Sequence, residues 1–181
     1  MPPAGWLAVG RPRPGVPLAA VRHNAGMGVL TDYFSAPSDA AAASALDRTG
    51  GPGQPAAGPS PLPPFDTFQA KGLDPYVIMG RLEEALTGQD YQVITAGPRY
   101  GRLVAQRGAH GPWVTTVSRP LQAALSLADS GTLARAAAEW SQAEELSGAS
   151  AGDLTAILEE LSGLARRATA RGEHLYCWTC L

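Results

Sequence analysis

Residues 153–181 read DLTAILEELSGLARRATARGEHLYCWTCL, a stretch in which a helix pattern runs directly into a strand pattern. Apolar residues recur at three- and four-residue spacing, which predicts an amphipathic helix from Asp153 to Arg171. Asp153 stands at the positive end of the helix dipole, arginines stand at the negative end, and Gly172 ends the helix. The apolar stripe consists of Leu154, Ile157, Leu158, Leu161, Leu164, Ala165 and Ala168.

The segment that follows, Leu175–Leu181, is rich in aromatic and other residues that favour strands. We expect so hydrophobic a strand to lie inside a sheet, paired along both of its edges. The whole chain then predicts an α+β fold, in which a small mixed or antiparallel sheet is covered by helices.

Shorter patterns upstream predict the remaining elements. Asp74 as N-cap, Pro75 at the first helical position and Gly88 just past the end bound one helix. The other predicted helices follow Ser38, span 118–128 with entry through Pro120, and span 133–140. Strands are expected at 28–34 and 65–71, and 102–106 with 113–117 should form a hairpin.

Length and composition indicate one domain with two irregular segments. Residues 1–26 hold five prolines and no acidic residue, so we expect a disordered N-terminal extension with the native start at Met27. Residues 27–181 would then form a single α+β domain. Within it, ten of the sixteen residues of 49–64 are Gly or Pro, which predicts a loop.

Charge and hydropathy argue against several classes of partner. The net charge is −2 with both signs interspersed, so there is no basic field to attract nucleic acid or an anionic membrane. No apolar run approaches the roughly 20 residues of a membrane helix, and none resembles a secretory signal. Both cysteines lie in the last five residues, which is not a disulfide framework. We therefore expect a cytoplasmic protein that binds neither nucleic acid nor membrane.

Cys177 and Cys180 have the spacing of a redox or metal-binding pair. Such a pair normally sits at a helix N-terminus, where the dipole lowers the pKa of the thiol. In a strand, residues three apart point to opposite faces, so the favoured interpretation is two small packing residues. The alternative is a metal or redox site formed by Cys177, Cys180 and His174, completed by a partner chain. No cofactor is expected.

Two other motifs match catalytic sequence patterns but lack the structural context that those patterns require. Gly148–Gly152 fits G-x-S-x-G, but the segment before it is polar rather than a buried strand, so it is interpreted as a connector that caps the Asp153 helix. Gly51–Ala56 fits a glycine-rich phosphate loop, but its prolines remove backbone donors. The sequence therefore contains no predicted catalytic residue.

Trp140 and its acidic neighbours are the candidate partner-binding residues. A tryptophan at the end of an alanine-rich helix is more often a core residue than a recognition anchor, and the anchor is kept as the alternative. Glu144 and Glu145 follow it in a polar segment. If Trp140 is an anchor, the three residues together would form a contact surface.

The order of elements resembles the YfbM-like family of small bacterial proteins of unknown function, over residues 27–181. The chain departs from the family pattern in the loop at 49–64 and in the lack of a tryptophan in the Asp74 helix. The resemblance implies an α+β fold and a cytoplasmic bacterial protein, and it transfers no functional residues. It is based on Met27-Gly28 opening a strand, the helix from Leu73-Asp74 to Leu86-Thr87-Gly88, the segment Val114–Leu125, and the final helix running through Ala170-Arg171-Gly172 into the terminal strand.

Two functions remain open from the sequence. The first is a non-enzymatic interaction domain, for example an immunity-type or regulatory partner of another bacterial protein. The second is a small metal- or thiol-dependent enzyme that uses the C-terminal cysteines. The oligomeric state is not predicted.

Overall fold

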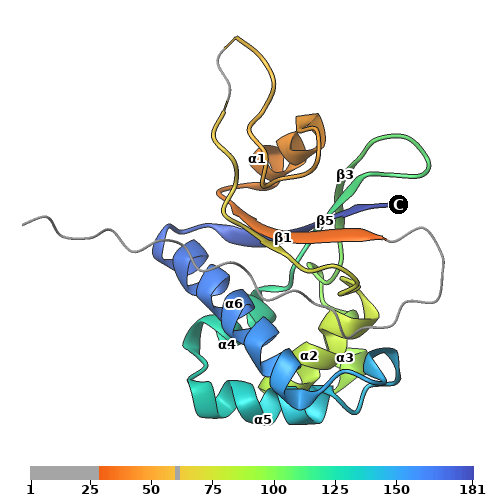
Figure 1. Cartoon of the computed structure of the whole chain (residues 1–181), viewed down its shortest axis with the longest axis vertical. Coiled ribbons are helices and arrows are strands. Elements are labelled where there is room, and N and C mark those ends of the chain that lie inside the picture. The colour runs from red at the N-terminus through yellow and green to blue at the C-terminus, as the bar shows by residue number, and fades with distance from the viewer. Residues whose placement is uncertain (1–28, 60–61) are drawn as a thin grey trace, which may run out of the picture.

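The computed structural model describes residues 29–59 and 62–181, so the prediction for residues 1–26 lies outside the described residues. The described chain forms an antiparallel five-stranded sheet in the order β2-β1-β5-β4-β3, with helices packed on it (Figure 1). The predicted α+β class is confirmed.

The strands are β1 (Leu30–Ala36), β2 (Thr67–Gln69), β3 (Leu103–Gln106), β4 (Trp113–Thr116) and β5 (His174–Cys180). The helices are α1 (Asp39–Ala43), α2 (Val77–Thr87), α3 (Tyr91–Thr95), α4 (Arg119–Leu127), α5 (Ser130–Trp140) and α6 (Ala151–Ala170), with 3-10 turns η1 (Ser44–Asp47) and η2 (Glu144–Leu146).

The C-terminal strand β5 occupies the centre of the sheet, as its hydrophobicity predicts. Cys177 lies opposite Tyr33 of β1 on one edge and opposite Thr115 of β4 on the other. The predicted hairpin is also confirmed, because β3 and β4 pair antiparallel. The last strand of the chain therefore joins the hairpin to the β1–β2 half of the sheet.

Side-chain caps start most of the helices where the sequence predicts them. The hydroxyls of Ser38, Ser118 and Ser150 each accept a backbone N–H from the first turn of the following helix. The helix α2 begins later than predicted, at Val77, because Asp74 accepts the N–H groups of Tyr76 and Val77 from outside the helix. Gly88 ends α2 in the left-handed conformation, with φ of 69°.

The short helix α3 was not predicted. It has only five residues, and its Val93 is exposed, so no amphipathic stripe marks it in the sequence. Asp90 caps it by accepting the N–H of Gln92 at 2.8 Å. A helix this brief depends on its cap and on packing against α2 rather than on a periodic pattern.

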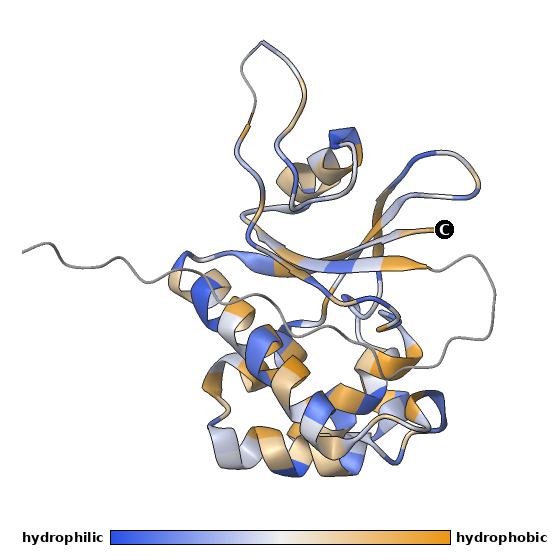
Figure 2. Ribbon diagram, viewed as in Figure 1, coloured by the Kyte–Doolittle hydropathy of each residue, from blue (hydrophilic) through white to orange (hydrophobic). Residues whose placement is uncertain are grey.

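The two faces of the sheet are covered differently (Figure 1). One face, which we call the helical face, is covered by α4 and α6, with α2 packed against α4 and α5 packed against α2 and α6, and its core is mainly aliphatic. The other face, which we call the loop face, lies under α1, η1 and the segments 48–59 and 62–66. Figure 2 shows hydrophobic and hydrophilic residues alternating along the helices of the helical face. The buried cluster of the loop face consists of Phe34, Ala36, Ala42, Ala45, Val114, Tyr176 and Trp178.

The glycine- and proline-rich segment packs onto the loop face. Its described residues have no helix or strand, and both Gly51 and Pro52 are buried. Gly51 has φ of 98°, and a Cβ there would lie 3.0 Å from Oδ2 of Asp32. Glycine is therefore required where this segment crosses the sheet. None of the helices in residues 29–59 and 62–181 is long and apolar enough to cross a bilayer.

Candidate functional site

The two cysteines of the C-terminal motif lie on opposite faces of the sheet. Cys177 is fully buried in the core of the helical face, and burial raises the pKa of its thiol to about 12. Cys180 is partly exposed and packs against the cluster on the loop face. A low-pKa, accessible thiol is what redox or metal chemistry needs, and Cys177 has the opposite properties.

His174 does not form a cluster with the two cysteines. It lies six residues before Cys180 on the extended strand β5, which corresponds to roughly 20 Å along the strand. Burial and the nearby charges of Arg119 and Arg99 lower the pKa of its imidazole. Among residues 29–59 and 62–181, no three His, Cys, Asp or Glu side chains are grouped so that they could hold a metal ion.

Ser150, the serine of the G-x-S-x-G match, is the N-cap of α6. Its hydroxyl accepts the N–H of Asp153 at 3.1 Å and donates to the Asp153 carboxylate at 2.7 Å. Both contacts belong to the helix start, as the sequence predicts for this connector.

Trp140 is a core residue. Only 1% of its surface is exposed, and its indole N–H donates to the carbonyl of Ile78 at 2.8 Å. It joins α5 to α2, in agreement with the favoured core interpretation, and it does not project from the surface as an anchor. Trp140 also lines a surface hollow of about 300 Å³.

The hollow, which we call the acidic hollow, brings Trp140 together with Glu144 and Glu145 of η2. Both glutamates are exposed, and each was a predicted partner-binding residue. The structure adds Glu139 of α5 and two residues of α2, Arg81 and Glu84, which lie about sixty positions away in the sequence. The complete wall consists of Arg81, Glu84, Glu139, Trp140, Gln142, Ala143, Glu144 and Glu145.

The side chains that line the acidic hollow carry a net negative charge. Four carboxylates and one guanidinium line it, so its formal charge is −3. The guanidinium of Arg81 is 2.9 Å from the Glu84 carboxylate and lies 4.4 Å above the ring of Tyr91, which holds it at one side. The remaining carboxylates, Glu139, Glu144 and Glu145, are available to a cation from outside.

On the loop face, Asp39 at the start of α1 is the centre of a charge cluster that sequence reasoning missed. Its carboxylate accepts hydrogen bonds from Arg99 at 3.0 Å, from the Tyr176 hydroxyl at 2.8 Å, and from Arg102. These donors, with Arg99 first, lower the pKa of Asp39 to about 2. All partners come from distant segments, and the saturated cluster fastens α1 to the sheet rather than offering a free reactive group.

Asp32 of β1 is the other acidic group on the loop face. It is 6% exposed and has no hydrogen-bond partner within the described residues. Burial raises the pKa of its carboxyl to about 6, against a smaller lowering by Lys71. The strand pattern could have placed Asp32 inward, but the cover by Gly51 was visible only in the structure.

Comparison of this chain with family models, with curated proteins and with solved structures found no match. The resemblance to the YfbM-like family therefore stays an expectation drawn from the sequence. Any functional conclusion has to come from the geometry of the chain itself.

Proposed function

We propose that this chain is a non-enzymatic interaction domain that binds a basic segment of a partner protein at the acidic hollow. The observation that carries the proposal is the convergence of four carboxylates, from α2, α5 and η2, on one surface depression with a formal charge of −3. Complementary charge is how such surfaces select their partners and speed their encounter.

The shape of the hollow suits a lysine or arginine side chain. These side chains have an apolar stem and a charged head, and the stem packs on apolar surface while the head stays polar. Ala143 provides apolar wall, backed by the buried Trp140, and Glu139, Glu144 and Glu145 provide the acceptors. Trp140 is held by its bond to Ile78, so the wall is in place before a partner arrives.

The experiment compares two charge reversals of equal size. Glu144→Lys/Glu145→Lys changes the formal charge of the hollow from −3 to +1, whereas Glu159→Lys/Glu160→Lys makes the same change in charge at an exposed pair on α6, outside the hollow. Each purified full-length protein is immobilised, and host proteins retained from lysate are identified and quantified. We expect at least one basic protein to bind wild type and the α6 variant but not the η2 variant.

Salt provides a second readout for the retained protein. Because the contact is electrostatic and exposed, raising NaCl from 50 to 500 mM should weaken it. A partner that binds the η2 variant as tightly as wild type would contradict the proposal. Retention of no protein that distinguishes the two double variants would do the same.

A further inference from the structure

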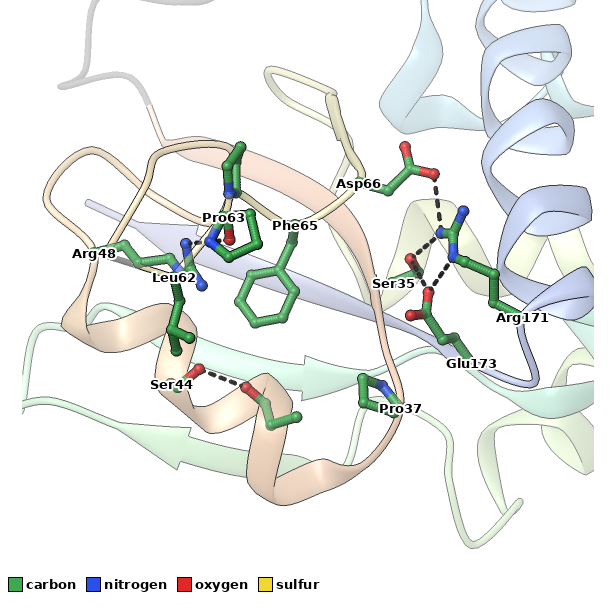
Figure 3. A pocket seen from close by; sticks show the side chains of 12 residues that line it. Ser35, Pro37, Ser44, Arg48, Leu62, Pro63, Phe65, Asp66, Arg171 and Glu173 are labelled. Carbon is green, nitrogen blue, oxygen red and sulfur yellow. Dashed lines mark hydrogen bonds and ion pairs between the residues drawn. The ribbon is translucent and has the colours of Figure 1, made fainter. Parts of the chain in front are cut away.

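A cleft of about 520 Å³ lies on the loop face, beside α1 and the segment 62–66 (Figure 3). It is separate from the acidic hollow and shares no residue with it. Much of its wall is apolar, with Ala41 on one side and Leu62 and Phe65 on the other. A cleft of this volume falls in the range of small-molecule sites.

Arg48 is the unusual residue in the wall. It follows η1, is only 5% exposed, and reaches toward Phe65, with its Cζ 4.4 Å from the ring centroid (Figure 3). Its Nη1 donates to the carbonyls of Gln54 at 2.6 Å and Pro63 at 3.0 Å. Within the described residues Arg48 forms no ion pair, and burial lowers the pKa of its guanidinium.

The other charged residues of the wall are already compensated. Arg171 is 2.9 Å from Glu173 and 3.0 Å from Asp66, and Asp66 also accepts from Arg167 at 2.8 Å. Ser35 donates to Glu173 at 2.7 Å. Arg48 therefore supplies the one uncompensated charge among the charged side chains that line the cleft.

The donors of Arg48 are only partly used. A guanidinium has five N–H groups, and the two carbonyl contacts occupy those of Nη1. The hydrogen bonds within the described chain leave Nε and Nη2 unused, and Nε is buried. A buried cation without a counter-charge is costly, and a bound anion is the usual remedy.

We propose that this cleft binds a small amphipathic monocarboxylate. Its carboxylate accepts from Nη2 of Arg48, and its apolar body packs against Phe65 and Leu62. A single negative charge matches the single uncompensated guanidinium. A phosphate dianion would exceed that charge in a wall that already holds two carboxylates, Asp66 and Glu173.

The test uses hexanoate as probe, titrated into the full-length protein by calorimetry, with hexanamide and inorganic phosphate as comparisons. We expect saturable one-to-one binding of hexanoate, about tenfold or more weaker binding of the neutral amide, and no competition by phosphate. Equal binding of acid and amide, displacement by phosphate, or no hexanoate binding would overturn the proposal.

Variants locate the site. Arg48→Lys keeps the charge but removes Nη2, the donor to the carboxylate, and hexanoate affinity should fall about tenfold or more. The matched control is Arg107→Lys, which alters an exposed arginine paired with Asp47 outside the cleft and should bind as wild type does. Weakening by the control to the same extent would overturn the assignment to Arg48.

A second variant covers the case in which Arg48→Lys fails to fold. Ala41→Phe fills the cleft from α1 and leaves Arg48 and its two carbonyl contacts in place. It should abolish hexanoate binding while the thermal transition persists. Wild-type affinity in the folded Ala41→Phe protein would place the ligand elsewhere and refute the proposal.

Discussion

The two faces of the sheet are formed by the same strands but differ in how their buried polar groups are hydrogen-bonded. On the helical face, the hydroxyl of Tyr33 donates to the carbonyl of Leu73 at 3.0 Å, and Oγ1 of Thr115 is buried without a partner in the described chain. On the loop face, Asp32 is buried without a hydrogen bond in the described chain, as are Nε of Arg48 and Nε1 of Trp178. Of the buried side-chain atoms without a partner in the described chain, three lie on the loop face and one lies on the helical face, so unpaired polar groups are concentrated on the loop face.

The covers explain the difference. Helices satisfy their own backbone groups, so α6, with its apolar stripe, can bury a whole face of aliphatic side chains. The segments 48–59 and 62–66 have only isolated backbone hydrogen bonds, such as that from Phe65 N–H to the Pro52 carbonyl, and side chains satisfy further carbonyls, as Arg48 does for Gln54 and Pro63. A cover of that kind brings polar and charged groups onto the sheet.

The largest effect should come from removing the strand that both faces share. Deleting residues 174–181 removes β5 from between β1 and β4, and we expect the cooperative thermal transition to disappear in circular dichroism. Deleting only Leu181, which is 59% exposed, is the control and should leave the transition in place. A cooperative transition in the longer deletion would contradict the central role of β5.

A cavity in the helical face should be costly. Leu158→Ala removes a fully buried side chain of α6 and should lower the free energy of unfolding by about 2–5 kcal/mol. Leu127→Ala, at the exposed end of α4, should change it by less than about 0.5 kcal/mol. Urea denaturation measures both, and a small loss for Leu158→Ala would mean that this face is not tightly packed.

The loop face should respond to pH through Asp32. Its pKa is raised from 3.8 to about 6 in the folded state, so folding binds a proton between these values. Stability should therefore fall as pH rises from about 4 to about 6 and stay low above that, by up to about 3 kcal/mol. Asp32→Asn should remove this dependence.

The measurement is the difference in unfolding free energy between wild type and Asp32→Asn, by urea denaturation at several pH values from 4 to 7. Asp39 provides the contrast, because its lowered pKa of about 2 makes its contribution fall only below pH 4. A difference that stays constant over pH 4–7 would show that Asp32 does not titrate in this range.

The smallest effects concern the cysteines, which belong to different faces. Cys180 should react with a thiol reagent in the native protein, whereas Cys177, with its raised pKa and full burial, should react only after denaturation. Cys177→Ala should cost about 1–3 kcal/mol and Cys180→Ala less. Rapid native labelling of Cys177, followed by mass spectrometry, would show instead that β5 opens.

The candidate sites could be predicted only in part. Trp140, Glu144 and Glu145 were singled out because they are close in sequence, and the structure does place them at one hollow. Arg81 and Glu84 could not be predicted as part of the hollow, because no local sequence pattern links α2 to η2. Arg48 carried no signal either, since a lone arginine beside a glycine-rich segment resembles any surface residue.

The sequence by itself determined the elements whose causes are local. Caps such as Ser118, the αL glycine at 88, the stripe of α6 and the hydrophobicity of β5 act within a few residues, so they can be read without knowing the fold. Only the tertiary structure decided which charges meet. Asp39 is paired with Arg99 and Arg48 is left alone because contacts between distant segments depend on how whole elements pack, and no short-range pattern encodes them.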